Sequence, residues 1–520
     1  MIKIAFVIVG GEINCIGGRR VAAVTKKMAD LTDIYYIIPT SKTGLLTTLD
    51  IDIISEKFAL YDIVCFSSMT YTVDNVFAIA KRVKERNNKV FTLLGGVHAT
   101  LFPDDAIEKV DAICIGEGEK PMQRFLEMYK DEKEYYNTEG LWFNKGGGIL
   151  KNPTEALNTN DELNIYQIGQ DSLNSWIYDV GIKQFVRITK FHYLEFNRLE
   201  YPTIWTLGCP YTCSYCSNSG FAQIDKNYRK LRYPKPEIVV REIEDAISRH
   251  PYISTISFYD DNMIALPFNV LESFCSLYKS KINLPFTMYG IHPNTINKEK
   301  VELLSSSGMI RTKMGIQSGN QNTLELYKRN TSLEKIRSGV TILADAQKKY
   351  KMMSPRYDII CDNPVETRED IISSLRFYNT LRRPFLFNIF SLRVFPGTKL
   401  TYYFKENNIK CAESFYFKIR PTFSNVILYL IACVKIPNWI LEKLLPKVKG
   451  YEEEQKEYPV LLKILSRLFY YKYFINHFNR LFCPFRVITG KWLFIYWKFF
   501  IKKNKSLKVL SDRDNEEQMV

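Results

Sequence analysis

The sequence lacks the features of a secreted, membrane-spanning or fibrous protein. Its 11 cysteines among 520 residues are too few, and odd in number, for a disulfide scaffold. It contains no apolar run of roughly 18 residues, the length that a membrane-spanning helix requires. The opening MIKIAFVIVGGE is a short apolar run without the basic and small-residue flanks of a secretory signal. These absences predict a cytoplasmic location in a reducing compartment.

The overall composition is that of a globular chain with several cores. Hydrophobic residues make up 46% and charged residues 24%, and no internal repeat or low-complexity segment occurs, which excludes a disordered or collagen-like chain. The length suggests about three domains. The formal net charge of +15 is compatible with nucleic acid, anionic lipid or acidic small molecules and does not choose among them.

Short apolar runs alternate with helix-like stretches over residues 1–135. This alternation predicts a doubly wound parallel sheet of the Rossmann-like type, with ligands bound beyond the carboxyl ends of its strands. The expected strands cover residues 4–9, 34–38, 63–66, 90–94 and 112–115. The segments that follow them include Gly10-Gly11, Ser67-Ser68, Gly95-Gly96 and Gly116-Glu117-Gly118.

The rest of the chain is expected to form three further parts. Residues 136–200 are interpreted as a linker that contains a β-hairpin around the glycine triplet at 146–148. Residues 201–400 alternate again, which predicts a partial (β/α)6 TIM-like barrel with its chemistry at the carboxyl ends of the strands. The expected strands are 204–207, 255–259, 286–289, 311–316, 357–360 and 387–392. Residues 401–520 are expected to be mostly helical, and they are rich in aromatic and basic residues.

Three cysteines lie together in the segment GCPYTCSYC. Cys209, Cys213 and Cys216 have the spacing CxxxCxxC directly after the first expected barrel strand. Three thiolates would leave one iron of a [4Fe–4S] cluster open to an organic ligand. The alternative is a structural zinc site, for which Cys275 or Cys361 is available as the fourth ligand.

This loop resembles the CxxxCxΦC loop of the radical S-adenosylmethionine (radical SAM) superfamily, where Φ is aromatic. Four later segments resemble that family in the same order: FYDDNM at 258–263, GIQSGN at 315–320, DNPVETRED at 362–370 and FPGTKL at 395–400. Two departures are Gln317 in place of the family's Glu and Leu207 in place of its usual Arg.

The resemblance implies a set of cofactors and ligands. The three cysteines would hold a [4Fe–4S] cluster that reductively cleaves S-adenosyl-L-methionine to a 5′-deoxyadenosyl radical. Tyr215 would cover the edge of the ligand, and Asp260, Gln317 and Ser318 would bind S-adenosylmethionine. For Asp260, a role as a helix cap is an open alternative. No catalytic base is identified; His292 is the best candidate in the barrel, and a loop role for it is equally open.

Two segments of the first domain resemble the cobalamin-binding domain of the vitamin B12-dependent radical SAM branch. They are GGVHATLFPDDAI at 95–107 and GEGEKPMQRFLE at 116–127. The resemblance implies a cobalamin site formed by Gly95, Gly96, His98, Gly116, Glu117 and Gly118. No DxHxxG motif occurs in residues 1–135, so no histidine is placed to bind cobalt from below. His98 is alternatively a packing residue.

The function implied is a cobalamin-dependent radical SAM enzyme that methylates an unactivated carbon of an unknown lipid-like or secondary-metabolite substrate. Ring contraction, cyclisation and rearrangement stay open for the same architecture. One alternative is a cobalamin-free radical SAM oxidoreductase or cyclase. Another is a non-catalytic zinc-binding protein of the membrane surface.

The expected partners are a small-molecule substrate and a reductant such as flavodoxin or ferredoxin, with no nucleic acid. The aromatic stretches at 469–480 and 492–501 are expected either to cap the barrel or to contact a membrane surface peripherally. In the second case the basic face would be formed by Lys491, Lys498, Lys502, Lys503 and Lys505.

Overall fold

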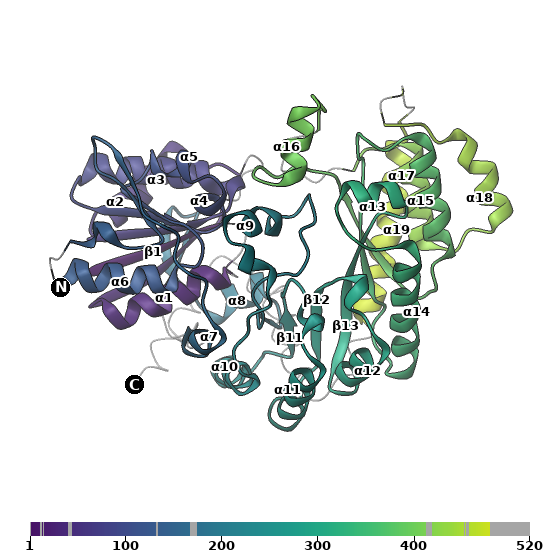
Figure 1. Ribbon diagram of the computed structural model, residues 1–520, viewed down its shortest axis with the longest axis horizontal. Helices are drawn as coiled ribbons and strands as arrows, with labels where there is room; N and C mark the ends of the chain where they lie inside the picture. Colours follow the sequence, from purple (N-terminus) through teal and green to yellow (C-terminus); the bar gives the residue numbers. More distant parts are fainter. Residues whose placement is uncertain are drawn as a thin grey trace. The chain divides into compact units, whose positions relative to one another are not determined.

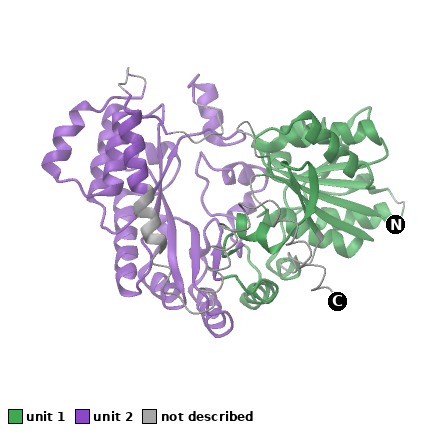
Figure 2. Cartoon of the chain, turned by 180° about the vertical axis from the view of Figure 1, so that it is seen from behind, with its two compact units in different colours: residues 1–201, 232–253, 489–520 green, residues 202–231, 254–488 purple. Residues whose placement is uncertain are grey.

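The computed structural model describes residues 2–10, 13, 15–39, 44–131, 134–166, 174–411, 419–451, 453 and 457–478. The chain divides into two compact units (Figure 2). Unit 1 comprises residues 1–201, 232–253 and 489–520, and unit 2 comprises residues 202–231 and 254–488. The chain therefore leaves unit 1 for a stretch of unit 2 that carries all three clustered cysteines, and then returns.

Unit 1 contains a nine-stranded sheet within the described residues. Its order is β7-β6-β5-β4-β3-β1-β2-β8-β9. The strands are β1 (Lys3–Val9), β2 (Leu31–Ile37), β3 (Ile63–Ser68), β4 (Phe91–Gly95), β5 (Ala112–Cys114), β6 (Leu141–Asn144), β7 (Ile149–Lys151), β8 (Asn174–Asp179) and β9 (Gln184–Arg187). Strands β1 to β5 and β8 pair in parallel, and β6, β7 and β9 pair antiparallel. The doubly wound parallel sheet is confirmed.

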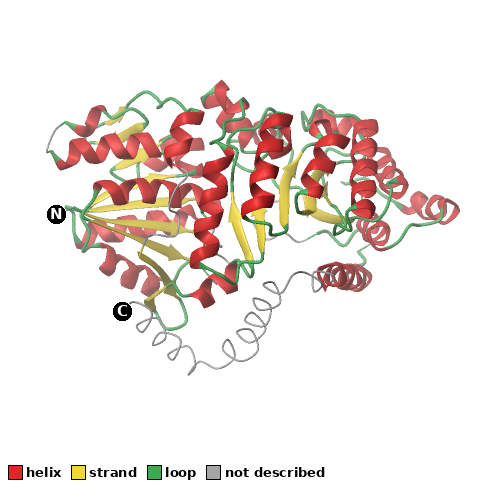
Figure 3. Cartoon of the chain, turned by 90° about the horizontal axis from the view of Figure 1, so that it is seen from below, coloured by secondary structure: helices red, strands yellow, loops and turns green. Residues whose placement is uncertain are grey.

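Helices cover both faces of this sheet (Figures 1 and 3). Helices α2, α3 and α5 pack on one face, and α1 and α6 on the other. Because both faces are covered, the central strands are buried throughout and appear in the sequence as continuous apolar runs. The helices of unit 1 are α1 (Ile16–Met28), α2 (Thr48–Phe58), α3 (Val73–Arg86), α4 (Val97–Leu101), α5 (Pro103–Ile107), α6 (Glu119–Lys130), α7 (Asn160–Tyr166), α8 (Lys190–Phe196) and α10 (Pro236–Arg249).

The segment 136–200 extends this sheet at both edges. The hairpin expected around the glycine triplet forms as β6 and β7, which join the sheet beside β5. A second hairpin, β8 and β9, joins it beside β2. The expected boundaries at 135 and 200 stay a prediction, since the structure places its own division at residue 201.

In the part of the chain that the structure describes, unit 2 is built around a six-stranded sheet whose strands follow one another in sequence order. The strands are β10 (Glu200–Thr203), β11 (Thr255–Phe258), β12 (Phe286–Ile291), β13 (Met309–Gln317), β14 (Arg356–Cys361) and β15 (Leu386–Ser391). The pairs from β11 to β15 are parallel, and β10 and β15 are the two edges of the sheet. The partial (β/α)6 barrel is confirmed.

The first barrel strand was predicted four residues too late. Residues 204–207 lie in the loop that follows the strand, where Trp205 is fully buried and Ile204 and Leu207 are half-buried, so the segment has the composition of a strand. The helices associated with unit 2 are α9 (Asn218–Ile224), α11 (Phe268–Lys281), α12 (Lys298–Ser306), α13 (Gln321–Leu326), α14 (Leu333–Lys349), α15 (Arg368–Thr380), α16 (Lys399–Glu406), α17 (Phe423–Cys433), α18 (Asn438–Leu444) and α19 (Pro459–Phe478).

The C-terminal region is helical as far as it is described, from α16 to α19. The aromatic stretch at 492–501 and the five lysines from 491 to 505 lie outside the described residues. Among the described helices, none is both long and apolar enough to cross a membrane.

Candidate functional site

The cysteine loop follows β10 and is held by its backbone. Gly208 has φ +91°, and a side chain there would collide with the carbonyl oxygens of Tyr228 and Lys230. Next to it, the amide of Cys209 donates to the Tyr228 carbonyl at 3.0 Å. The amide of Ser214 donates to the carbonyl of Tyr327 at 2.8 Å. Glycine at 208 is therefore required for the loop to pass this close to residues 228–230.

The three thiols are neighbours, because Cys213 is close enough to raise the pKa of both Cys209 and Cys216. Burial, and to a smaller extent the carboxylate of Asp261, raise the pKa of Cys209 and of Cys216 to about 12. Among the described residues, no group of three or more His, Cys, Asp or Glu side chains is arranged to hold a single metal ion. A set of three neighbouring thiols fits a cluster whose ligands bind separate irons, with one iron left open.

Asp260 holds the start of this loop. Its buried carboxylate, 1% exposed, accepts hydrogen bonds from the amides of Trp205 at 3.2 Å and Thr206 at 2.5 Å, and from the Thr206 hydroxyl at 2.7 Å. Burial raises the pKa of Asp260 to about 6 although all three bonds lower it. In the structure this side chain serves the loop, and its predicted contact with S-adenosylmethionine stays a prediction.

A buried cation beside the cysteines escaped the sequence analysis. The guanidinium of Arg329, 5% exposed, donates to the Tyr215 hydroxyl at 2.8 Å, to Cys213 Sγ at 3.5 Å and to the carbonyl of Gly315. Its Nε is buried without a hydrogen-bond partner. A positive charge at this position favours thiolates and other anions, including a ligand carboxylate.

Of the remaining residues predicted to bind S-adenosylmethionine, Tyr215 and Gln317 lie beside this cation. Tyr215 is fixed by its bond to Arg329 and packs edge-on against Tyr327 at 5.2 Å between ring centroids. Gln317 ends β13 with φ +70°, a left-handed conformation that is uncommon outside glycine. The buried Ser318 hydroxyl accepts from the amide of Asn320 at 3.1 Å. The structure thus brings Tyr215 and Gln317 together near Gly315 of β13, through Arg329.

The side chain of His292, the candidate base, makes structural contacts through both ring nitrogens. Its Nδ1 accepts from the amide of Asn294 at 3.2 Å, and its Nε2 lies 3.0 Å from the carbonyl of Arg329. The imidazole also stacks on Tyr211, with centroids 3.6 Å apart and planes at 14°. Burial, and then the charge of Arg329, lower its pKa to about 3. Because both nitrogens are engaged and the ring is neutral, the loop role is the one that the geometry favours.

The inner face of the barrel is polar. Met314 contacts α14 at Gly339, so its neighbour Lys313 faces the opposite side, into the barrel. There Lys313 Nζ lies 3.3 Å from the carboxylate of Asp358, which also accepts from Asn388 at 2.9 Å. Tyr259 and Tyr289 stack at 4.5 Å with planes at 10°. Charged and aromatic groups here are suited to binding a polar ring system rather than to filling a core.

In unit 1, two glycines shape the carboxyl edge of the sheet. Gly96 follows β4 with φ +94°, and a Cβ there would lie 3.0 Å from the carbonyl oxygen of Ser68. Gly116 follows β5 with φ +86°, and a Cβ there would meet nothing within 4 Å. Thr100 joins them, because its hydroxyl donates to the Gly96 carbonyl at 2.9 Å and accepts from the Gly116 amide at 3.1 Å. The edge is thus rigid at Gly96 and open at Gly116, which fits the close approach of a large flat ligand.

His98 lies inside this edge rather than on it. It is 4% exposed, its Nε2 is 3.0 Å from Asp105 Oδ2 and its Nδ1 is 3.4 Å from Thr70 Oγ1. The ring stacks on Phe102, and burial lowers its pKa. With both nitrogens partnered, His98 offers no free ligand atom, which agrees with the absence of a DxHxxG motif. Its contact with cobalamin stays a prediction.

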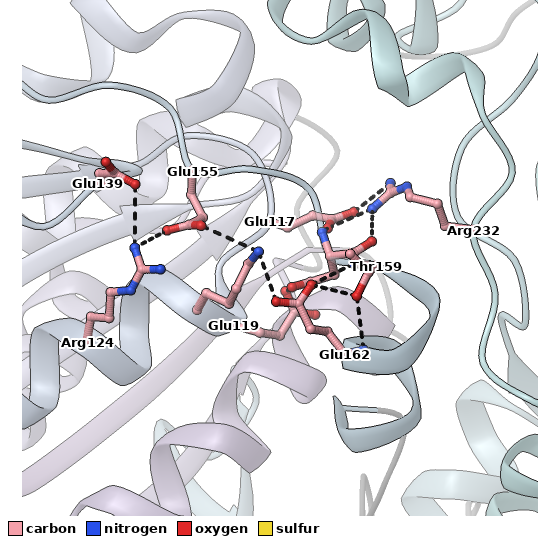
Figure 4. Close-up of polar contacts among 10 residues, drawn as sticks. Glu117, Glu119, Arg124, Glu139, Glu155, Thr159, Glu162 and Arg232 are labelled. Carbon is pink, nitrogen blue, oxygen red and sulfur yellow. Dashed lines mark hydrogen bonds and ion pairs between the residues drawn. The ribbon is translucent and has the colours of Figure 1, made fainter.

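Glu117 is paired with a residue that the sequence analysis did not single out. Arg232 contacts both of its carboxylate oxygens, at 2.8 and 2.9 Å (Figure 4). The two residues are 115 positions apart, so no local pattern could have shown the pair. Gly118 packs against Val21 of α1, where a Cβ would lie 3.1 Å from the valine.

The zinc alternative gains no support from the other cysteines. Cys275 is buried in α11 and hydrogen-bonded to Ser307. Cys361 is hydrogen-bonded to Asp362 at the end of β14. Neither completes a metal site with the three clustered thiols among the described residues.

Comparison with known proteins identifies both units. The B12 binding domain family matches residues 5–126, and the Radical SAM superfamily matches residues 203–378. An uncharacterized methyltransferase of Pyrococcus horikoshii is 25% identical over 370 residues, which are 70% of this chain and 73% of that protein. The anaerobic magnesium-protoporphyrin IX monomethyl ester cyclase of Rubrivivax gelatinosus is 23% identical over 61% of this chain and 54% of that protein.

A solved structure shares the fold. It is the radical S-adenosylmethionine methyltransferase TsrM from Kitasatospora setae, solved with tryptophan substrate and an S-adenosylmethionine analog. The match has a TM-score of 0.60 at 15% identity and covers 80% of this chain and 78% of that one. With both family matches in the predicted order, the chain belongs to the radical SAM enzymes that carry a B12 binding domain ahead of the barrel.

Proposed function

We propose that the chain is a cobalamin-dependent radical SAM methyltransferase that methylates an unactivated carbon of a small molecule. One observation carries the proposal: a single chain combines a three-cysteine loop in its barrel with a B12-type unit in which a Cβ at Gly116 would meet nothing within 4 Å. The methyltransferase relative and the fold match both cover at least 70% of this chain and support the same reaction.

The chain's own residues would hold the cofactors and restrict their surroundings. When bound, the [4Fe–4S] cluster with S-adenosylmethionine supplies radical chemistry, and cobalamin supplies methyl transfer. Cys209, Cys213 and Cys216 would hold the cluster on a loop that Asp260 keeps in place. Arg329 would balance the negative charge of the cluster and face the carboxylate of S-adenosylmethionine, beside Tyr215, Gln317 and Ser318.

The substrate would lie along the inner face of the barrel. Lys313, Asp358 and Asn388 offer donors and acceptors there, and the stacked pair Tyr259 and Tyr289 offers an aromatic surface. This combination favours a substrate with a flat ring and a polar or anionic substituent.

Product analysis tests the proposed reaction. The full chain, loaded with its cofactors without oxygen, is incubated with S-adenosylmethionine, a chemical reductant and small-molecule extracts. A methylated product together with S-adenosylhomocysteine supports methyl transfer, and a Cys213→Ala chain should give neither. Deoxyadenosine with an unmethylated product would select the second candidate, a cyclase or another radical rearrangement, which the similarity to the Rubrivivax cyclase favours.

An external electron donor such as flavodoxin or ferredoxin would reduce the cluster. It is tested by replacing the chemical reductant with purified flavodoxin and its reductase. Formation of deoxyadenosine supports the donor, and its absence with an active chemical control contradicts it.

We also propose peripheral contact with an anionic membrane surface through α19. Val460, Ile464 and Leu468 form an exposed apolar stripe at helical spacing, 71%, 50% and 55% exposed, and the exposed Lys463 and Arg467 lie along its edge. An apolar stripe flanked by cations suits an anionic headgroup layer. Sedimentation with phosphatidylglycerol vesicles should exceed that with phosphatidylcholine and fall when all three apolar residues become serine. Equal sedimentation would contradict the contact.

A further inference from the structure

We propose that Arg232 is a positioning residue for the Gly116–Gly118 loop, and so for the edge that would receive the corrin. The inference rests on the proposed binding of cobalamin by unit 1. It assigns Glu117 an indirect role, in place of the direct contact that its sequence motif implies.

The ion pair between Arg232 and Glu117 is almost fully buried, and both partners are also hydrogen-bonded to Asn158. The side chains of Arg232 and Glu117 are each 11% exposed, with Nη2 2.8 Å from Oε1 and Nη1 2.9 Å from Oε2. The same Nη1 donates to the carbonyl of Asn158 at 2.9 Å, and the amide of Asn158 donates back to Glu117 Oε2 at 2.7 Å. A two-pronged pair of this kind fixes the direction of the carboxylate as well as its place.

The segment that follows Arg232 is itself held by hydrogen bonds. The amide of Tyr233 donates to the side chain of Asn160 at 2.9 Å, and the amide of Lys235 donates to that of Asn164 at 2.7 Å. Both acceptors lie on α7 of the same unit. The guanidinium therefore acts as a fixed support for the loop rather than as a flexible surface charge (Figure 4).

In the Gly116–Gly118 loop, the side chain of Glu117 is held by hydrogen bonds, whereas the space next to Gly116 is open. The carboxylate of Glu117 is directed to Arg232 and Asn158, which leaves it no role as a direct ligand. One residue earlier, a Cβ at Gly116 would meet nothing within 4 Å, and the Gly116 amide is bonded to Thr100. Holding Glu117 thus fixes the backbone that leaves this space open.

The test is the affinity of the full chain for hydroxocobalamin, followed by absorbance, together with urea unfolding of the same variants. Arg232→Met should weaken hydroxocobalamin binding about tenfold or more, the scale of effect seen when a supporting contact of a bound group is lost. The affinity of Arg232→Lys for hydroxocobalamin should lie between those of the unaltered chain and Arg232→Met, because an ammonium keeps the charge but not the two-pronged geometry.

A double variant separates positioning from stability. Arg232→Met alone leaves a buried carboxylate unpaired and lowers stability. Adding Glu117→Met removes that unpaired charge, so the unfolding free energy should recover while the affinity stays low. Arg124→Met is the matched control, because Arg124 lies on α6, outside the loop, and the change removes its ion pairs with Glu155 and Glu139. It should leave the affinity unchanged.

The outcomes are distinct. Unchanged affinity in Arg232→Met would overturn the positioning role, and so would recovery of affinity together with stability in the double variant. If the unaltered chain binds no hydroxocobalamin, the proposed cobalamin dependence fails, and the role of Arg232 fails with it.

Discussion

Removing the carboxylate of Asp260 should release the cysteine loop. The side chain accepts three hydrogen bonds from Trp205 and Thr206, and each bond to a charged group contributes about 1.5–3 kcal/mol. Against this, the pKa of about 6 means that ionising the buried carboxyl costs about 3 kcal/mol more than in water. Asp260→Ala should therefore lower the unfolding free energy by about 2–6 kcal/mol at neutral pH.

Asp260→Asn provides the graded comparison. An amide oxygen can keep both bonds from Thr206, but its NH2 group then faces the amide of Trp205, so one bond is lost instead of three. The expected order of unfolding free energy and of iron per chain after reconstitution is wild type, then Asn, then Ala. Urea unfolding and iron analysis measure both. An Asp260→Ala chain that keeps full iron and stability within about 0.5 kcal/mol of wild type would contradict this role of Asp260.

The same carboxyl predicts a pH dependence. Its pKa is raised from 3.8 to about 6 on folding, so between these values the folded chain holds a proton that the unfolded chain has released. Stability from this group is therefore present at low pH and is lost as the pH rises through about 4 to 6, by roughly 3 kcal/mol in all. Asp260→Asn should lack this component, and an identical pH profile in both chains would contradict the assignment.

Further substitutions at four positions probe the two units. Arg329→Met should lose most of its cluster iron and Arg329→Lys less of it, because the buried cation beside Cys213 is removed in one and kept in the other; full iron in Arg329→Met would contradict its role. Gly116→Ala should lower the unfolding free energy by the roughly 1–2 kcal/mol of backbone strain that a positive φ imposes. Gly96→Ala should lower it by more, because at Gly96 the new Cβ would also lie 3.0 Å from a carbonyl oxygen. Gly116→Ala should also weaken hydroxocobalamin binding, and unchanged binding would show that the open space is not used. His292→Gln should leave the profile of S-adenosylmethionine cleavage unchanged over about pH 6–8, since this imidazole is already neutral there; a shifted profile would restore it as a base.

The strands of both units could be predicted because burial on both faces leaves continuous apolar runs, such as that of β1. The exception is informative. Residues 204–207 have the composition of a strand, but Trp205 is buried in a loop whose amides bond to Asp260 instead of to a neighbouring strand. The composition of a segment indicates whether it is buried, whereas the hydrogen-bond partner of each of its amides depends on residues far along the chain.

The same limit applies to the candidate site. The cysteine spacing and the glycine segments could be recognised because their residues are adjacent in sequence. Arg329 reaches Tyr215 across 114 positions and Arg232 reaches Glu117 across 115. Neither arginine lies in a motif, and both were found only because the fold brings a buried cation to a group whose position in the sequence was already known.

Cofactor analysis of the full chain tests the central claim most directly. The protein is purified without oxygen and reconstituted with iron, sulfide and hydroxocobalamin, and its absorption spectrum is recorded beside its iron and cobalt content. We expect about four irons and one corrin per chain, with the iron lost in Cys213→Ala and the corrin retained. Iron without corrin would withdraw the methyl transfer, and a chain without iron would contradict the whole account.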